Sequence, residues 1–169
     1  MDRLGPAALV FGLIALLLLL MWWGWRARAK RQAGYARPAL VPANLPRTTL
    51  AVKALYLSTT PADSALDRLV VPGLGFRADA VVSASAAGLV LKLRGEPELF
   101  IAADNLVGIE AATLTIDRVV ETDGLLRLRW MLGEDAVDSY FRLFDESDRH
   151  EFLTTVRRLA GDNPSPRLK

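Results

Sequence analysis

The sequence contains no cysteine and only one histidine, His150. The lack of cysteine excludes disulfide bonds, zinc sites built on thiolates and thiol nucleophiles. A single histidine cannot by itself build a metal site or a Ser-His-Asp triad. Carboxylates are plentiful, but they fall in expected turns and at the start of an expected helix, so their spacing does not indicate paired acid-base catalysis. We therefore expect no enzymatic activity, no cofactor and no metal.

Acidic residues are missing from the stretch 26–47, which holds six basic residues. The stretch 49–160 has the opposite balance, with 12 basic and 17 acidic residues and a net charge of −5. The net charge of +2 for the whole chain is therefore caused by the short basic stretch. Because nucleic acids require a basic surface and the domain is acidic, we expect no nucleic-acid partner.

Charged side chains are also missing from Leu4 to Trp25, a run of 22 residues. As a helix this run is about 33 Å long, enough to cross a hydrocarbon core of about 30 Å. Trp22, Trp23 and Trp25 mark its far end, where aromatic rings prefer the headgroup region. We predict a transmembrane helix over 4–25. The rival interpretation is a cleaved signal peptide, but the run is too long for one and basic residues follow it at once.

The basic residues beside this run predict its orientation. Its C-terminal side carries Arg26, Arg28, Lys30 and Arg31, whereas its N-terminal side carries Arg3 alone. The positive-inside rule then predicts a single-pass protein of the plasma membrane, with its N-terminus outside and its C-terminal domain in the cytoplasm. Whether the basic cluster also binds anionic lipid stays open.

Prolines at positions 38, 42 and 46 follow the basic cluster. They predict a basic, extended and semi-rigid linker over 26–48. We expect the globular domain over 49–161 and a disordered tail over 162–169. Since the domain is acidic and the linker is extended, the domain is expected to face away from an anionic bilayer.

Alternation of apolar and polar residues dominates the domain and predicts strands. The predicted strands are 50–59, 76–86, 89–94, 98–102, 106–111, 125–132 and 136–143, and 115–121 is ambiguous. Within 76–86 the alternation puts Phe76 on the same face as Ala80 and Val82. After Asp145, a plausible N-cap, the apolar spacing becomes helical and continues to Gly161.

About seven short strands followed by one amphipathic helix is the element order of a small β-barrel whose open end the helix caps. We therefore predict a mainly β, pleckstrin-homology-like (PH-like) barrel capped by a C-terminal α-helix and preceded by one transmembrane helix. The stretches Met21–Gln32, Tyr56–Leu69, Gly73–Ala80, Gly95–Leu106 and Arg129–Arg142 also give the sequence a likeness to a family. The chain resembles the actinobacterial membrane-anchored PH-like proteins. The resemblance implies a membrane location and a PH-like fold, with no assigned activity.

The segment from Thr59 to Gly75 is long for a hairpin loop, and long ordered loops often carry function. The candidate contact residues of this loop are Thr60, Asp67, Arg68, Val71 and Leu74. The alternative is a loop that packs its apolar side chains under the barrel. The sequence does not decide between the two.

Two further motifs are weaker. Residues 73–78 (GLGFRA) match the dinucleotide-binding fingerprint, but a strand follows where the chemistry requires a helix N-terminus, so we predict a turn. Lys53, Lys92 and Arg94 could form a patch, and alternation puts the last two on one strand face. We do not expect binding of a phosphoinositide-type headgroup, because the domain is acidic.

The expected function is that of a non-enzymatic, membrane-tethered interaction or scaffold module. Its cytoplasmic PH-like domain is expected to contact a protein partner by the 59–75 loop or by a sheet edge. The alternative is an accessory subunit of a membrane transport or export complex, in which the helix packs against other spans. In both cases the lipid bilayer is the partner of the N-terminal helix. The identity of the protein partner and the oligomeric state stay open.

Overall fold

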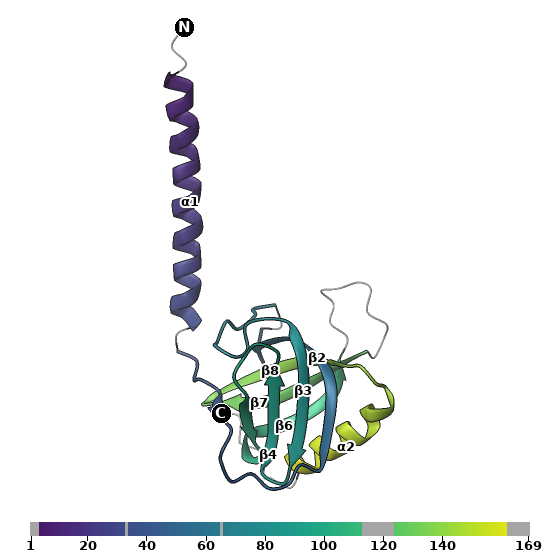
Figure 1. The fold of residues 1–169 in the computed structure, drawn as a ribbon. Helices are drawn as coiled ribbons and strands as arrows, with labels where there is room; N and C mark the ends of the chain where they lie inside the picture. Colours follow the sequence, from purple (N-terminus) through teal and green to yellow (C-terminus); the bar gives the residue numbers. More distant parts are fainter. Residues whose placement is uncertain (1–3, 33, 65, 113–123, 162–169) are drawn as a thin grey trace. The chain divides into compact units, whose positions relative to one another are not determined.

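The computed structural model describes residues 4–32, 34–64, 66–112 and 124–161 (Figure 1). The chain divides into two compact units, Met1–Gly34 and Tyr35–Lys169, which we describe separately. The ambiguous segment 115–121 and the predicted tail 162–169 lie outside the described residues.

The first unit consists of one long helix, α1 (Leu4–Gln32). Within it, Leu9–Ala27 is long and apolar enough to cross a membrane, and its side chains are exposed. The helix continues beyond Trp25, where the sequence predicts the transmembrane segment to end. The reason is local: the residues from Arg26 to Gln32 are arginine, alanine, lysine and glutamine, all of which favour helical backbone.

The second unit is built on one antiparallel sheet of eight strands, in the order β1-β5-β4-β3-β2-β8-β7-β6. The strands are β1 (Ala39–Leu40), β2 (Leu50–Pro61), β3 (Ala78–Ser85), β4 (Gly88–Leu93), β5 (Leu99–Ala102), β6 (Leu106–Ala112), β7 (Leu125–Leu132) and β8 (Asp135–Leu143). Except for the short β1, these are the seven strands that the sequence predicts.

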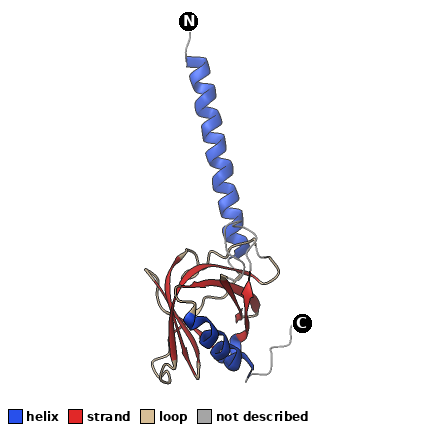
Figure 2. Ribbon diagram, turned by 90° about the vertical axis from the view of Figure 1, so that its right-hand side faces the viewer, coloured by secondary structure: helices blue, strands red, loops and turns tan. Residues whose placement is uncertain are grey.

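The strand order shows that this sheet is curled. β5 and β6 lie six places apart in the order, a distance of roughly 29 Å in a flat sheet. Only the short 3-10 helix η1 (Ala103–Asn105), of 3 residues, joins them along the chain. The sheet must therefore bend until its two ends approach one another, and Figure 2 shows the strands curving in this way.

A C-terminal helix, α2 (Ser147–Gly161), packs against β6, η1 and β2. Phe152 and Val156 form its buried face. The carboxylate of Asp145 accepts a hydrogen bond from the backbone N–H of Ser147 at 2.9 Å and so caps the start of the helix. Hydrogen bonds from the Ser147 side chain and backbone lower the pKa of Asp145. These features confirm the predicted architecture, a mainly β barrel capped by a C-terminal α-helix.

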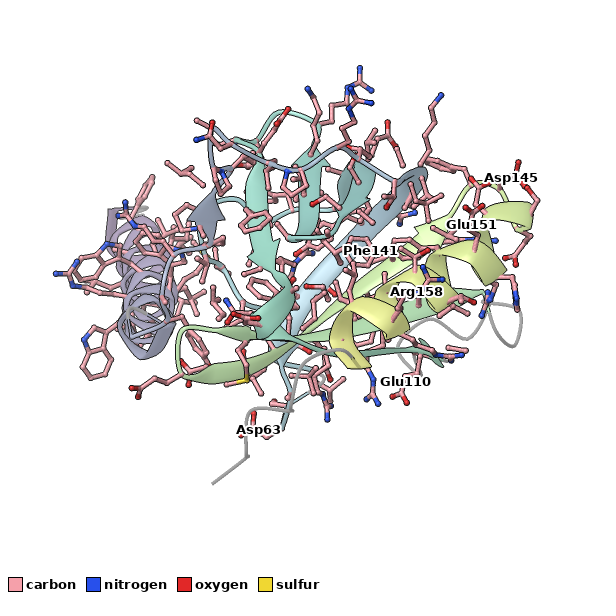
Figure 3. All side chains as sticks on the ribbon, turned by 90° about the horizontal axis from the view of Figure 1, so that it is seen from below. Asp63, Glu110, Phe141, Asp145, Glu151 and Arg158 are labelled. Carbon is pink, nitrogen blue, oxygen red and sulfur yellow. The ribbon has the colours of Figure 1, made fainter. Side chains whose placement is uncertain are left out.

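The barrel interior is filled by the inward residues of its strands. In β2, for example, Val52, Ala54 and Tyr56 are buried, while Lys53 is exposed and Leu55 is half-buried. Figure 3 shows the side chain of Phe141 inside the barrel, and its ring centroid lies 5.6 Å from that of Tyr56. One prediction about this face is wrong. β3 begins only at Ala78, so Phe76 lies in the preceding loop and is 73% exposed.

The segment that the sequence predicts as a linker, 26–48, is divided between the two units. Its first part continues α1 to Gln32. Its second part belongs to the domain: Tyr35 packs against the core, and β1 pairs with β5. Backbone pairing and the partly buried ring of Tyr35 keep this part of the chain on the barrel, so its prolines do not form an isolated spacer.

Candidate functional site

The predicted interfacial residues of α1 lie near the end of its apolar stretch. Trp22, Trp23 and Trp25 are 52%, 70% and 67% exposed. The guanidinium carbon of Arg26 lies 5.7 Å from the ring centroid of Trp22, a distance at which a cation attracts an aromatic face. Arg28, Lys30 and Arg31 share the helical backbone of α1, but their side chains lie outside the part that the structure describes.

The loop between β2 and β3, residues 62–77, includes most of the predicted contact residues. We call it the plug loop, because Leu69, Val71 and Leu74 are buried in the core at one end of the barrel. The structure therefore corrects part of the predicted contact set. Val71 and Leu74 face inward, and so does Thr60, which belongs to β2 and is buried. None of these three side chains can touch a partner without unfolding the barrel end.

The two charged candidates of the loop remain at the surface. Asp67 is exposed, and Arg68 is half-buried. The guanidinium of Arg68 donates a hydrogen bond to the backbone carbonyl of Leu57 at 2.9 Å. This bond ties the outer side of the loop to β2, so Arg68 also has a structural role. The formal dinucleotide fingerprint lies in the same loop and is a turn, with Gly73 at a φ of 86° and β3 following.

A chain of buried hydrogen bonds fixes the plug loop to the barrel. The indole N–H of Trp130 donates to Ser139 Oγ at 2.9 Å, and Ser139 Oγ lies 2.7 Å from Thr59 Oγ1. Thr59 Oγ1 lies 2.8 Å from the hydroxyl of Tyr56, which donates to the backbone carbonyl of Leu74 at 2.8 Å. Because an indole N–H only donates and a carbonyl only accepts, every hydroxyl between them donates in the direction of Leu74. The chain thereby links β7, β8 and β2 to the loop.

Tyr56 stands in the middle of this chain. Burial raises the pKa of Tyr56 to about 12, although the hydrogen bond with Thr59 and the positive charge of Arg68 oppose the shift. The phenol is therefore neutral at physiological pH and can donate to Leu74. Tyr56 is fully buried, and its hydroxyl bonds to the loop at Leu74. We therefore assign this hydroxyl the structural role of holding the loop against the barrel.

A second surface lies on the outer face of β2, β3 and β4, where an open cavity has a volume of about 670 Å³. We call it the β2–β4 groove and define it by Lys53, Val81, Lys92, Arg94 and Phe144. Strand register places Lys53 opposite Val81 and Val81 opposite Lys92. The backbone N–H of Phe144 donates to the carbonyl of Lys53 at 3.1 Å and puts the aromatic residue at the end of this row.

The charges in the groove are mixed. Lys92 Nζ lies 2.7 Å from a Glu98 oxygen, and this hydrogen bond raises the pKa of Lys92, helped by the negative charge. Arg94 lies 3.4 Å from Asp79. Lys53 is exposed and has no ion-pair partner among the described residues. The structure thus brings together the three cations of the predicted patch, but it surrounds them with carboxylates.

Neither Val81 nor Phe144 is among the residues that the sequence singles out, and Phe144 is the more exposed of the two, at 61%. The sequence nevertheless contains a pattern that predicts an outward side chain at position 144. Leu143 ends β8 with its side chain in the core, so alternation turns the next residue outward, and Asp145 then starts the helix cap. A large aromatic residue in that position has no core to fill, which marks it as a candidate contact residue.

The remaining charged cluster joins β6, β7 and β8. Arg129 donates two hydrogen bonds to the buried carboxylate of Asp138, at 2.7 and 2.8 Å. Arg127 forms ion pairs with Glu110 and Asp138. Because each charge faces an opposite charge, we interpret the cluster as a staple between strands. Among the described residues, no group of three or more His, Asp or Glu is placed to hold a metal ion.

Comparison with known proteins adds the family of the domain. A family model described as bacterial PH domain-like matches residues 36–157. The matched range begins one residue after Tyr35, the first residue of the domain unit, and extends into α2. It therefore includes β1 and the whole sheet. Among curated proteins, none matches the sequence.

Proposed function

Because the chain belongs to the bacterial PH domain-like family and carries one long apolar helix, we propose that it is a membrane-tethered, non-enzymatic interaction module. The observation that carries this proposal is the β2–β4 groove. It is an open surface on regular strands, it exposes an aromatic ring, and it holds one cation without an ion-pair partner among the described residues. The groove is therefore the part of the domain best suited to bind a partner.

The chemistry of the groove fits a protein surface. The groove contains Phe144 and Arg94, and aromatic residues and arginine are enriched at protein–protein interfaces. A partner that places a carboxylate on Lys53 and an apolar side chain between Phe144 and Val81 would pair the Lys53 charge and cover the exposed Phe144 ring at once. The carboxylates of Asp79 and Glu98 disfavour a purely anionic ligand by repulsion.

The proposal includes an anchor and an orientation. The stretch Leu9–Ala27 supports a single membrane crossing, and the basic residues after it support a cytoplasmic domain. The absence of natural cysteine allows a clean test by single-cysteine labelling with a membrane-impermeant maleimide. In intact cells we expect Asp2→Cys to react at once and Glu151→Cys to react only after lysis. The reverse pattern would contradict the orientation.

A photo-crosslinking experiment tests the groove. A photoreactive amino acid is placed at Phe144 or at Lys53 of the full-length chain in native membranes, with Glu151, an exposed residue of α2, as the control position. We expect a discrete protein adduct from the two groove positions and none from Glu151. The same adducts from all three positions, or adducts from none, would refute binding at the groove.

Charge reversal provides a matched pair of variants for the same experiment. Lys53→Glu is expected to abolish the adduct formed from Phe144. Arg158→Glu makes the same change of charge on the exposed side of α2 and is expected to leave the adduct intact. If both reversals weaken it equally, the attraction depends on the net charge of the domain and not on the groove.

The alternative function, an accessory subunit of a membrane complex, is supported by a feature of α1. Gly12 and Gly24 carry no side chain, and small residues are the ones that let the backbone of a neighbouring membrane helix approach closely. Replacing residues 4–25 with an unrelated apolar helix separates the two functions. Preserved function favours the interaction module, and lost function with the domain still in the membrane favours the accessory subunit.

A further inference from the structure

The plug loop also exposes apolar side chains on its outer side. Leu66, Val70 and Phe76 are 80%, 58% and 73% exposed. They are three of the five large apolar side chains exposed in the described part of the domain, and the other two are Leu40 and Phe144. Single exposed apolar residues are ordinary, but a concentration of them on one loop marks a contact surface.

The chain enters the domain at the same end of the barrel as this loop. Tyr35, the first residue of the domain unit, lines a cavity of about 390 Å³ together with Arg129 of β7 and residues of two other segments. One segment is Pro61–Asp63, where β2 passes into the plug loop, and the other is Glu134–Ala136, at the turn between β7 and β8. Burial raises the pKa of Tyr35, and the negative charges of Asp135, Asp63 and Asp67 add to the shift.

Covalent length limits how far this end of the domain can move from a membrane that α1 crosses. The apolar stretch ends at Ala27 and the helix ends at Gln32, about 8 Å further along its axis. Only Ala33 and Gly34 separate Gln32 from Tyr35, and three peptide steps span at most about 11 Å. The headgroup region of a bilayer is itself roughly 5–7 Å thick on each side. The interface is therefore within reach of the loop.

The charge of the loop distinguishes apolar contact from headgroup recognition. Residues 62–77 contain Asp63, Asp67, Arg68 and Arg77, so their net charge is zero. The adjoining turn adds Glu134 and Asp135. These described residues give this end of the barrel no excess of cations that could select anionic lipid, whereas its exposed aliphatic and aromatic groups favour contact with a bilayer.

We infer that Leu66, Val70 and Phe76 insert into the lipid–water interface, so that the domain rests on the bilayer by the outer side of the plug loop. This inference rests on the proposed membrane anchor and is independent of the groove and its protein partner. It replaces the expectation that the domain faces away from the membrane. The buried half of the loop supplies the rigid support from which the exposed half reaches the lipid.

The test measures the depth of single probes in the full-length chain. A nitroxide is attached to one cysteine at position 66, 70 or 76, with Phe144→Cys and Glu151→Cys as exposed controls and Ile14→Cys as a probe of the anchor. The protein is reconstituted in vesicles of phosphatidylcholine, alone or with phosphatidylglycerol. Collisions with oxygen, which concentrates in lipid, are compared with collisions with a water-soluble nickel chelate.

We expect the three loop probes to collide less often with the nickel chelate, and more often with oxygen, than the control probes at 144 and 151. The two control probes should stay accessible to the chelate. The pattern should be the same in both lipid mixtures and at every protein-to-lipid ratio. Replacing Leu66 and Phe76 together with serine should return a probe at Val70 to water. These substitutions alter exposed side chains, so the barrel should remain folded.

Four results would overturn the inference. If the loop probes are as accessible as the control at 151 while Ile14 is shielded, the loop does not insert although the anchor stands. If Ile14 is accessible to the chelate, the anchor and the inference fail together. Shielding that appears only at high protein density identifies a second copy as the occupant. Shielding that requires phosphatidylglycerol identifies recognition of an anionic headgroup.

Discussion

The plug loop and the β2–β4 groove both expose apolar residues, but they do so for different structural reasons. In the groove, strand alternation turns Lys53, Val81 and Lys92 outward, and the core depends on none of them. The plug loop is not a strand, but Leu69 and Val71 are buried in the core while Val70 between them is exposed. The same loop is therefore a structural element on one side and a surface on the other. Substitutions should separate the two sides sharply.

The largest expected effect is on the buried side of the loop. Leu74→Ala should lower the free energy of unfolding by about 2–5 kcal/mol, because it removes a fully buried side chain and leaves a cavity. Leu66→Ala, the same substitution at an exposed position of the loop, should change it by no more than about 0.5 kcal/mol. Thermal and denaturant unfolding of the full-length chain, followed by circular dichroism, gives both values. Equal effects would show that the loop does not plug the barrel.

The next largest effect concerns the hydrogen-bond chain. Tyr56→Phe keeps the buried ring but removes the donor to the Leu74 carbonyl and the acceptor for the Thr59 hydroxyl proton, although Thr59 still accepts from Ser139. The loss should lower the free energy of unfolding by about 1–3 kcal/mol. Thr154→Ala is the control, since the Thr154 hydroxyl donates to the backbone carbonyl of His150 on the exposed face of α2. The account is contradicted if the two variants are equally stable.

The pKa of Tyr56 adds a dependence on pH. The phenol ionises near pH 10 in the unfolded chain and near 12 in the fold, so the unfolded state binds fewer protons between these values. Stability from this group is complete below pH 10 and is lost as the pH rises through 12, by roughly 2–3 kcal/mol in all. Tyr56→Phe should lack this loss. The difference between the two unfolding curves over that range isolates the contribution of Tyr56.

In the groove we expect a small effect on stability and a large one on binding. Phe144→Ala should change the free energy of unfolding by no more than about 0.5 kcal/mol, because the ring is mostly exposed. The adduct formed from a photoreactive residue at Lys53 should nevertheless disappear. A variant that loses stability and binding together would show that Phe144 supports the fold, and the groove would then lose its best evidence for a partner.

The smallest effect is expected for the ion pair at the edge of the groove. Glu98→Gln removes the partner of Lys92, and both side chains are well exposed. Exposed pairs contribute little, so the unfolding temperature should not change measurably. The pKa of Lys92, followed by NMR, should fall towards its ordinary value. An unchanged Lys92 pKa would mean that the pair does not form in solution.

The regular parts of the domain could be predicted because their patterns are periodic. Alternation identified the seven strands, and the change of period at Asp145 identified the capping helix. Phe76 shows the limit of this method: it continues the alternation of β3, but β3 pairs with β2 only from Ala78 onward. A side-chain period does not reveal where backbone pairing begins.

The candidate site could be predicted only in part, because burial in a loop depends on distant segments. Val71 and Leu74 are inward since Tyr56 and the open barrel end lie beneath them, and nothing in the loop sequence distinguishes them from Val70 or Leu66. The boundary between the predicted linker and the domain could not be located from the sequence for a similar reason. The pairing of Ala39 and Leu40 with β5 depends on residues far along the chain.

The central claim is that the tethered domain meets lipid by its plug loop and protein by its groove. Probe accessibility at two positions, compared between native membranes and vesicles of pure lipid, tests it most directly. We predict that a probe at position 66 is shielded from the water-soluble chelate whether or not other membrane proteins are removed by reconstitution. A probe at position 144 should be shielded in native membranes and exposed after reconstitution into pure lipid. The account is contradicted if the two probes respond alike, or if position 66 is open to water in both preparations.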